Sequence, residues 1–282
     1  MTLRQLRLEA AARLEEAGIP QPMLEVRVLL ESLGISAERQ IIDAAQSVDG
    51  ELESRFLSLV RQRSAHQPSS YLTGHREFYG LDFIVDRNTL IPRADTETLV
   101  DAAAAYIRQH DCTALLDLCT GTGCVGIAIA HSTAVGRLVL ADISMSALEV
   151  AHRNAAALLG TETAWVCVCG DLFSALGNQR FSVITANPPY ICRSWEAGLS
   201  REVANEPALA LFDEAVDGLG TARRIVDEAP AHLFPGGFLA LECDYRQTGD
   251  LAVYMEQRGF RQVDVLKDLA GLDRVVCGLL PL

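Results

Sequence analysis

The stretch Leu116-Asp-Leu-Cys-Thr-Gly-Thr-Gly-Cys-Val-Gly126 decides the fold class of this 282-residue chain. It continues an apolar run that begins at Ala114, and its glycines at positions 121, 123 and 126 follow the pattern Gly-x-Gly-x-x-Gly. Between a strand and a helix, this pattern is typical of a turn that binds a nucleotide-like cofactor beside the first turn of the helix. The stretch therefore predicts a Rossmann-like α/β domain.

Further strands and helices alternate along the rest of the chain. Apolar runs predict strands over Ala114–Leu118, Arg137–Ala141, Ala164–Val168, Phe181–Ala186, Gly237–Glu242, Gln262–Leu266 and Arg274–Leu279, with helices such as Ala147–Leu158 and Ala222–Leu233 between them. This alternation predicts a seven-stranded, mostly parallel sheet with helices on both faces. Because only a short loop separates the last two strands, we expect them to form a hairpin, with the last strand antiparallel.

The part of the chain before this domain has a different pattern. Leu3, Leu6, Ala10 and Leu14 recur at helical spacing, and similar patterns follow up to about residue 60, so residues 1–66 are expected to form a helical bundle that docks a substrate. Residues 71–94 are expected to form a β-hairpin linker, with Phe78–Gly80 and Phe83–Val85 as short strands around a turn. The α/β domain would then occupy residues 95–282.

Composition excludes several classes of function. The net charge of −13 disfavours a sequence-independent grip on DNA or RNA, which depends on Lys and Arg neutralising phosphates. No apolar stretch approaches the roughly 20 residues of a membrane span, and the charged first residues lack the apolar core of a signal peptide. The eight cysteines include no Cys-x-x-Cys pair. We therefore expect a monomeric cytoplasmic protein without a bound metal, a membrane anchor or direct contact with nucleic acid.

Two aspartates favour one kind of cofactor. Asp142 closes the strand after the glycine turn, 21 residues beyond Gly121, where a carboxylate can accept both hydroxyls of a ribose. Asp117 lies at the strand tip, where an anion would repel the pyrophosphate of NAD but attract the ammonium group of S-adenosylmethionine. The alternative is a tight turn with a solvated aspartate at the end of a strand. Asp171 could accept the adenine amino group and Leu172 could pack on its ring, although Gly-Asp is also a common turn.

The tetrapeptide Asn187-Pro-Pro-Tyr190 follows the apolar run Phe181–Ala186 directly. Proline has no backbone N–H, so the carbonyl groups here are left to accept hydrogen bonds. The Asn187 side-chain oxygen and the Pro188 carbonyl could each accept one N–H of a flat –NH2 group, and Tyr190 could stack on it. This arrangement predicts methylation of a planar nitrogen. The alternative is a turn that only ends the strand.

Taken together, these motifs resemble the HemK/PrmC family, the N5-glutamine methyltransferases of class-1 peptide chain release factors. The resemblance covers nearly the whole chain. Its strongest elements are Tyr71-Leu-Thr-Gly-His-Arg-Glu-Phe-Tyr-Gly80, Thr89-Leu-Ile-Pro-Arg-Ala-Asp-Thr-Glu97, the Asp117–Gly126 turn and Asn187-Pro-Pro-Tyr190. It implies the fold of an S-adenosylmethionine-dependent methyltransferase, and as substrate the glutamine of the release factor's Gly-Gly-Gln loop.

The resemblance also implies roles for particular residues. Asn187, Pro188 and Pro189 would bind the substrate amide and Tyr190 would stack on it, with Asn187, Pro188 and Tyr190 as the catalytic residues. The cofactor would contact Asp117, Cys119, Thr120, Gly121, Thr122, Gly123, Asp142, Asp171, Leu172 and Asn187. The segment Ile91–Glu97 would border the methionine end of the cofactor, although Arg93 and Glu97 could instead form an ion pair at the start of a helix.

The chain departs from the family pattern in three places. Ala94-Asp95 stands where Pro-Glu is usual, Phe212–Val216 where a Gly-Gly pair is usual, and Cys243 where a glycine commonly follows the glutamate. Four alternatives stay open: DNA adenine-N6 methylation, glutamine methylation of a ribosomal protein, an NAD-dependent dehydrogenase, and a binding protein that keeps the fold without catalysis. A DNA enzyme would have to extract a base and grip phosphates, which the acidic composition disfavours.

Overall fold

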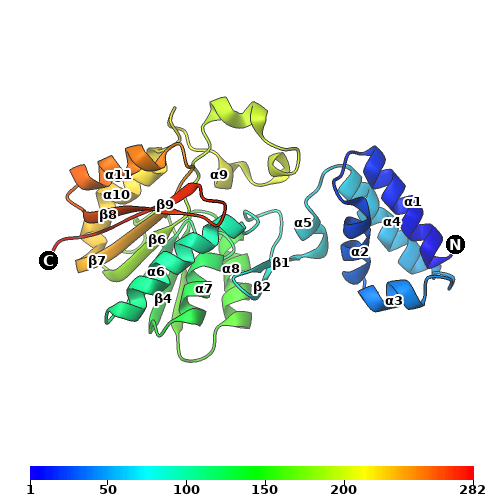
Figure 1. Cartoon of the computed structure of the whole chain (residues 1–282). Coiled ribbons are helices and arrows are strands. Elements are labelled where there is room, and N and C mark those ends of the chain that lie inside the picture. Colours follow the sequence, from blue (N-terminus) through cyan, green and yellow to red (C-terminus); the bar gives the residue numbers. More distant parts are fainter. The chain divides into compact units, whose positions relative to one another are not determined.

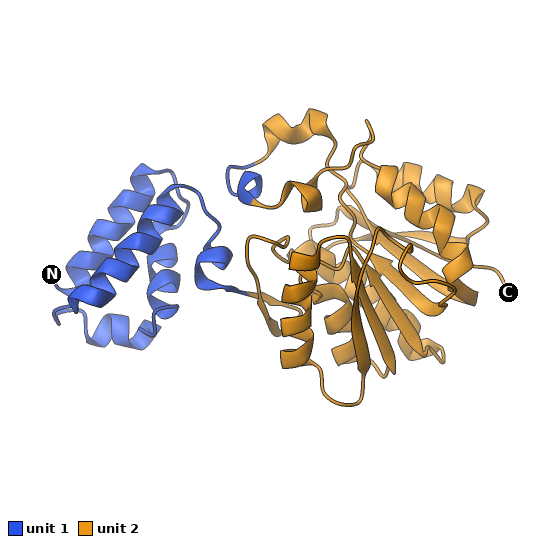
Figure 2. Cartoon of the chain, turned by 180° about the vertical axis from the view of Figure 1, so that it is seen from behind, with its two compact units in different colours: residues 1–75, 200–205 blue, residues 76–199, 206–282 orange.

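The computed structural model describes all 282 residues, which divide into two compact units. One unit comprises residues 1–75 together with residues 200–205, and the other comprises residues 76–199 and 206–282 (Figure 2). The helical part thus extends beyond the expected boundary at residue 66, because a further short helix follows it. Nothing in the sequence pattern predicted that residues 200–205 belong to the helical unit.

The helical unit is a small bundle with one apolar core. Its helices are α1 (Leu3–Glu16), α2 (Pro22–Glu31), α3 (Ala37–Ile42), α4 (Gly50–Ser64) and α5 (Ser69–Thr73). The core is built from side chains of α1, α2 and α4, among them the fully buried Leu6, Leu29 and Phe56. Thr2 and Gln5 form a capping box at the start of α1, which satisfies backbone N–H groups that have no partner inside the helix.

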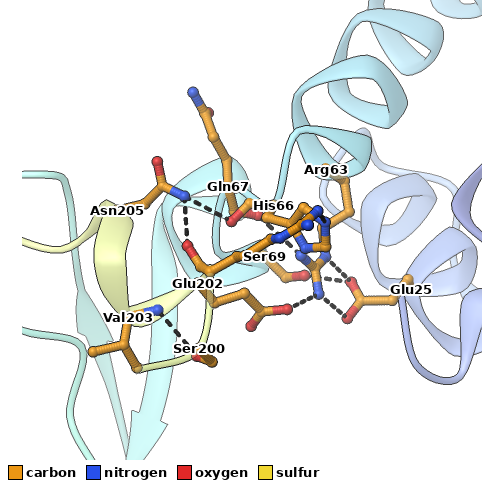
Figure 3. Close-up of polar contacts among 10 residues, drawn as sticks. Glu25, Arg63, His66, Gln67, Ser69, Ser200, Glu202, Val203 and Asn205 are labelled. Carbon is orange, nitrogen blue, oxygen red and sulfur yellow. Dashed lines mark hydrogen bonds and ion pairs between the residues drawn. The ribbon is translucent and has the colours of Figure 1, made fainter. Parts of the chain in front are cut away.

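A buried arginine ties the short helix η3 (Val203–Asn205) and its flanking residues into this unit. Arg63 of α4 is 2% exposed and forms ion pairs with Glu25 of α2 (Nε to Oε2, 3.1 Å) and with Glu202 (Nη2 to Oε1, 2.6 Å). Asn205 also donates a hydrogen bond to the His66 carbonyl at 3.2 Å (Figure 3). Residues 200–205 are therefore held by charge and hydrogen bonds rather than by an apolar contact.

The strands of the hairpin after the helical bundle have different bounds from the expected ones. Its strands are β1 (His75–Phe78) and β2 (Leu81–Ile84), and the turn between them is Tyr79-Gly80. Both turn residues have positive φ, +53° and +74°, as the tight two-residue turns of hairpins require. The expectation that residues 78–80 form a strand is wrong, since two of these three residues reverse the chain.

The second unit contains the seven-stranded sheet that the sequence predicted. The strands are β3 (Ala114–Leu118), β4 (Arg137–Asp142), β5 (Ala164–Cys169), β6 (Phe181–Ala186), β7 (Leu233–Glu242), β8 (Arg261–Lys267) and β9 (Asp273–Leu279). They lie in the order β5-β4-β3-β6-β7-β9-β8, and β4, β6, β7, β8 and β9 are labelled in Figure 1. Each pair of neighbouring strands from β5 through β4, β3 and β6 to β7 is parallel. Strand β9 is antiparallel to both of its neighbours, β7 and β8, which confirms the predicted terminal hairpin.

Helices cover both faces of this sheet. The helices α6 (Glu97–Gln109), α7 (Cys124–Ser132) and α8 (Met145–Leu158) share one core cluster, and α10 (Gly220–His232) and α11 (Thr248–Gln257) share the other. Along β3, Leu115 packs into the first cluster, whereas Leu116 and Leu118 pack into the second. The central strand is buried on both faces, as its continuous apolar sequence predicts. The short helices η1 (Ala94–Thr96), η2 (Arg193–Gly198) and α9 (Ala208–Leu211) complete the chain.

The strand order determines where a ligand can bind. The chain runs outward from β3 in one direction through β4 and β5, and in the other direction through β6 and β7. In open parallel sheets, ligands bind beyond the carboxyl ends of the strands where the order reverses in this way. Asp117, Asp142, Asn187 and Glu242 all lie at that edge, at or directly after the ends of four neighbouring strands. None of the helices is long and apolar enough to cross a membrane.

Candidate active site

A cavity of about 500 Å³ lies at this edge, wholly within the second unit. Its size is in the usual range for small-molecule sites. The loops after β3, β4 and β5 supply one part of the wall, and the segment after residue 206 supplies another. Of the predicted cofactor residues, the wall contains Asp117, Cys119, Thr120, Gly121, Thr122, Asp142, Asp171, Leu172 and Asn187. The structure therefore brings nearly the whole predicted set together, and Gly123 alone of this set does not line the cavity.

The glycine turn leads from β3 into α7 at the base of the cavity. Gly121 and Gly123 have φ of +54° and +82°, a conformation that other residues rarely adopt. A Cβ atom at Gly126 would lie 2.7 Å from Leu140 Cδ2 and 3.0 Å from Asp117 Cβ, so α7 packs closely on the sheet because this position has no side chain. The turn thus places the start of α7 beside the cavity, where Cys124 and Val125 line the wall.

Asp117 links the glycine turn to the sheet. Its Oδ2 accepts hydrogen bonds from Thr120 Oγ1 (2.5 Å) and from the Gly126 N–H (3.1 Å), and its Oδ1 accepts one from Thr185 Oγ1 (2.8 Å). Burial raises the pKa of this carboxyl to about 6, although the three hydrogen bonds act in the opposite direction. Asp117 therefore holds β3, β6 and the turn together, in addition to lining the cavity.

Asp142 and the loop after β5 supply further cavity groups. The Asp142 carboxylate accepts the Gly121 N–H on Oδ2 and the Ser144 N–H on Oδ1, both at 2.9 Å, and its oxygens keep lone pairs for two more donors. Burial raises the pKa of Asp142. Asp171 forms an ion pair with Arg224 at 2.8 Å, and the buried Leu172 has φ of +49°. Unusual backbone conformations such as this one are concentrated at functional sites.

Asn187-Pro-Pro-Tyr190 lies at the same edge, next to these groups. Asn187 and Pro189 line the cavity, whereas Pro188 and Tyr190 do not belong to its wall. Asn187 Nδ2 donates a hydrogen bond to Thr96 Oγ1 at 3.3 Å. The Tyr190 carbonyl accepts one from Gln247 Nε2 at 2.9 Å, and burial raises the pKa of the Tyr190 phenol. Thus the amide side chain of this motif is placed at the cavity, and its last residue is anchored behind it.

Known proteins share both parts of this chain. Residues 5–74 match the family described as PrmC N-terminal domain, and residues 96–206 match the methyltransferase small domain. The release factor glutamine methyltransferase of Deinococcus radiodurans is 35% identical over 98% of both chains. That of Burkholderia pseudomallei is 38% identical over 96% of both. The chain belongs to the release factor glutamine methyltransferase family. The resemblance inferred from the motifs is therefore confirmed, and the protein is a methyltransferase.

Solved structures agree on the fold of this family member. A methyltransferase from Pyrococcus furiosus has a TM-score of 0.52 at 15% identity and covers 83% of this chain and 100% of its own. A 16S rRNA N2 G1207 methyltransferase from Thermus thermophilus, solved in complex with AdoMet and guanosine, has a TM-score of 0.51 at 17% identity, covering 73% of this chain and 49% of its own. At these identities the likeness concerns the Rossmann-like methyltransferase fold alone.

The Ile91–Glu97 segment of this methyltransferase is held by a residue far along the chain. Arg93 forms an ion pair with Glu206, and the Ile91 N–H donates to Glu206 Oε2 at 3.0 Å. Glu97 instead accepts the Tyr79 N–H at 3.0 Å. The alternative of an ion pair between Arg93 and Glu97 is therefore wrong, because each side chain has another partner. Glu206, just before the segment that lines the far wall, was not identified from the sequence as a site residue.

The far wall of the cavity contains one of the departures from the family pattern. Phe212, Asp213 and Ala215 line the cavity there. The Asp213 carboxylate accepts the Gly220 N–H (2.9 Å) and the Thr221 N–H (2.7 Å) at the start of α10, which satisfies donors that have no partner inside the helix. In this family member a capping aspartate therefore orders the loop. No local signal in the sequence indicated this role, because the N-cap position of α10 is Leu219 and Asp213 lies seven residues before the helix.

Proposed function

We propose that this enzyme transfers a methyl group from S-adenosylmethionine to the side-chain amide nitrogen (N5) of the glutamine in the Gly-Gly-Gln motif of class-1 peptide chain release factors. The observation that carries this proposal is the position of Asn187, which joins the cavity that contains the glycine turn and Asp142. An acceptor for a planar –NH2 group thus lies beside a site for a methyl donor. The names of the full-length relatives support the choice of substrate.

The cavity fits S-adenosylmethionine in its volume and in the polar groups of its lining. Asp142 would accept the ribose hydroxyls, Leu172 would pack on the adenine, and Asp171 would accept its amino group. The rest of the cofactor would contact the turn residues Cys119, Thr120, Gly121, Thr122 and Gly123, and its methionine ammonium group would lie near Asp117. When bound, the cofactor supplies a methyl group on a positively charged sulfur. The buried Asp117 carboxylate suits a cation and would repel a pyrophosphate.

The residues after β6 would bind the substrate amide and orient its nitrogen for methyl transfer. An amide nitrogen is a poor nucleophile because its lone pair is delocalised into the carbonyl group. If the Asn187 side-chain oxygen and the Pro188 carbonyl each accept one N–H, they orient the nitrogen and stabilise the positive charge that develops on it. Pro189 would border the group and Tyr190 would stack on it. No strong base is needed before transfer, since the N–H becomes more acidic as the new bond forms.

The test of this proposal uses labelled methyl transfer. Purified protein incubated with methyl-labelled S-adenosylmethionine is expected to label a class-1 release factor. The same release factor with Gly-Gly-Gln changed to Gly-Gly-Ala is expected to remain unlabelled, because alanine has no side-chain nitrogen to accept the methyl group. Equal labelling of the two substrates would refute the assignment. Labelling of a ribosomal protein or of DNA adenine instead would favour the alternatives.

The helical unit is proposed to dock the release factor. Every wall residue of the cavity belongs to the other unit, so the helical residues are free for a role outside cofactor binding. Deleting residues 1–66 is therefore expected to weaken binding of the release factor by roughly tenfold or more, about 1.4 kcal/mol, with little change in cofactor affinity. Isothermal titration calorimetry with each ligand measures both effects. A larger loss for the cofactor than for the release factor would contradict this role.

The remaining expectations are also proposals. We propose that the enzyme acts as a monomer. Translation termination takes place in the cytoplasm, which is the proposed location. The charge of −13 supports recognition of a protein rather than direct contact with nucleic acid. Sedimentation of the purified chain at micromolar concentration would show a dimer if the first of these proposals is wrong.

A further inference from the structure

Glu242, the last residue of β7, is a buried carboxyl group beside the Asn187 motif. It is 1% exposed. The register of β6 and β7 pairs Ala186 with Leu241, so the next residue on each chain, Asn187 and Glu242, lie side by side. Thr96 and Asn187 are the neighbouring polar side chains that lower the pKa of this carboxyl group, whereas its Oε2 has no hydrogen-bond partner. A buried polar atom without a partner is uncommon and calls for a functional explanation.

The directions of the hydrogen bonds around Glu242 restrict the amide of Asn187. An ionised carboxylate can only accept hydrogen bonds, so both neighbours must turn their hydrogens toward it. Thr96 has a single hydroxyl hydrogen, and its oxygen already accepts a hydrogen bond from Asn187 Nδ2. The amide nitrogen of Asn187 is therefore directed at the Thr96–Glu242 pair. Its Oδ1 is left for the cavity, which Asn187 lines.

We propose that Glu242 is a positioning residue, which acts through Thr96 to keep Asn187 Oδ1 directed at the nitrogen that receives the methyl group. This inference rests on the proposed function. Without a fixed negative acceptor behind it, the amide could turn by 180° and present its –NH2 group, which would repel the N–H groups of the substrate instead of accepting them. The carboxylate thus selects one of two amide orientations that are nearly equal in shape.

The charge state of Glu242 should affect how the rate of methyl transfer depends on pH. Burial raises the pKa of this carboxyl to about 7, and Asp95 of η1 also raises it. Thr96, Asn187 and Arg274 of β9 lower it. Among the groups that face it, the Tyr190 phenol and the Cys243 and Cys124 thiols have pKa values raised in part by this carboxylate. Since only the ionised form is a pure acceptor, the rate of transfer is expected to fall as the pH falls through about 7.

The substitution Glu242→Gln tests the proposal in the full-length enzyme. Glutamine has nearly the same volume but offers both a donor and an acceptor, so it no longer selects the orientation of Asn187. The kcat for transfer from S-adenosylmethionine to the release factor is expected to fall roughly 10- to 100-fold, with the KM values nearly unchanged. The decline of the rate around pH 7 should disappear, so that any remaining fall begins only near the pKa of about 6 of Asp117. A kcat and a pH profile like those of the unmodified enzyme would overturn the proposal.

Two further comparisons separate positioning from a structural effect. Thr96→Val removes the hydroxyl and should lower kcat in the same way, whereas Thr96→Ser keeps it and should restore the rate and the pH profile. Failure of serine to rescue would contradict the relay through Thr96. Glu256→Gln, the same substitution at an exposed site in α11, is the matched control and should change neither quantity.

An NMR measurement tests the inference independently of the methyl acceptor. The side-chain –NH2 resonances of Asn187 should shift with pH in the purified protein, with a midpoint near 7, and should not titrate in Glu242→Gln. If these resonances do not respond to pH, the proposal fails even when release factors are methylated. If they titrate but no release factor is labelled, the positioning of Asn187 stands and the proposed substrate is wrong.

Discussion

Replacing Asn187 by alanine is expected to lower kcat for methyl transfer by about 10²- to 10³-fold, the usual loss when one preorganised polar group at a reacting centre is removed. The side chain lines the cavity and is held by a hydrogen bond to Thr96, so its oxygen is available at a fixed position. Alanine removes the acceptor that orients the substrate nitrogen and stabilises its developing charge. Single-turnover transfer of labelled methyl to a release factor measures this loss directly.

Cofactor affinity separates this effect from damage to the site. Asn187→Ala should bind S-adenosylmethionine nearly as well as the unmodified protein, because Asp142 and the glycine turn are unchanged. Asp142→Ala should show the converse, with weakened cofactor binding, since it loses the acceptor for the ribose and the contact to the Gly121 N–H. An Asn187→Ala enzyme with an unchanged rate would refute the role of Asn187 in the transfer step.

Replacing Arg63 by methionine is expected to destabilise the helical unit by about 3 kcal/mol, the lower end of the range for breaking a buried ion pair. Methionine fills most of the space but leaves Glu25 and Glu202 close together without their shared cation. The lower end applies because the Glu202 side chain is 39% exposed and can regain water. Hydrogen exchange of the α4 amides measures the loss of local stability, and exchange at residues 203–205 reports release of that segment.

Matched variants separate the ion pair from the simple loss of an arginine. Arg61→Met changes an exposed arginine on the same helix and should alter the stability of α4 very little. Adding Glu25→Gln and Glu202→Gln to Arg63→Met should restore part of the lost stability, because the repelling charges are removed. Faster exchange throughout the α/β unit in Arg63→Met would contradict a local role for this cluster.

Much of the α/β unit could be predicted because its signals are local. Runs of apolar residues marked all seven strands, with β3 and β6 at the expected bounds and the other strands extended by one to four residues at one or both ends. The Gly-x-Gly-x-x-Gly turn identified the entrance to α7, since only certain residues tolerate that backbone conformation. Periodicity was less informative at the hairpin, where an aromatic residue, Tyr79, occupies a turn position that usually takes Asn or Gly.

The candidate site also contains residues that the sequence could identify and residues that it could not. Asp142 and Asn187 could be identified because each directly follows an apolar run, and parallel strands bring their carboxyl ends to one edge. The partners of these residues could not be identified. Thr185 reaches Asp117 from 68 residues away, and Glu206 reaches Arg93 from 113 residues away. No local pattern distinguishes these side chains from other polar residues in turns or strands.

The sequence by itself determined the order of strands and helices, the glycine turn and the Asn187-Pro-Pro-Tyr190 motif, because backbone conformation and apolar periodicity act over a few residues. Only the tertiary structure decided which charged and polar side chains lie together: Arg63 with Glu25 and Glu202, Arg93 with Glu206, and Glu242 beside Asn187. The physical reason is burial. A charged side chain removed from water must find its partner in space, and that partner is chosen by the packing of the strands and helices rather than by its distance along the chain.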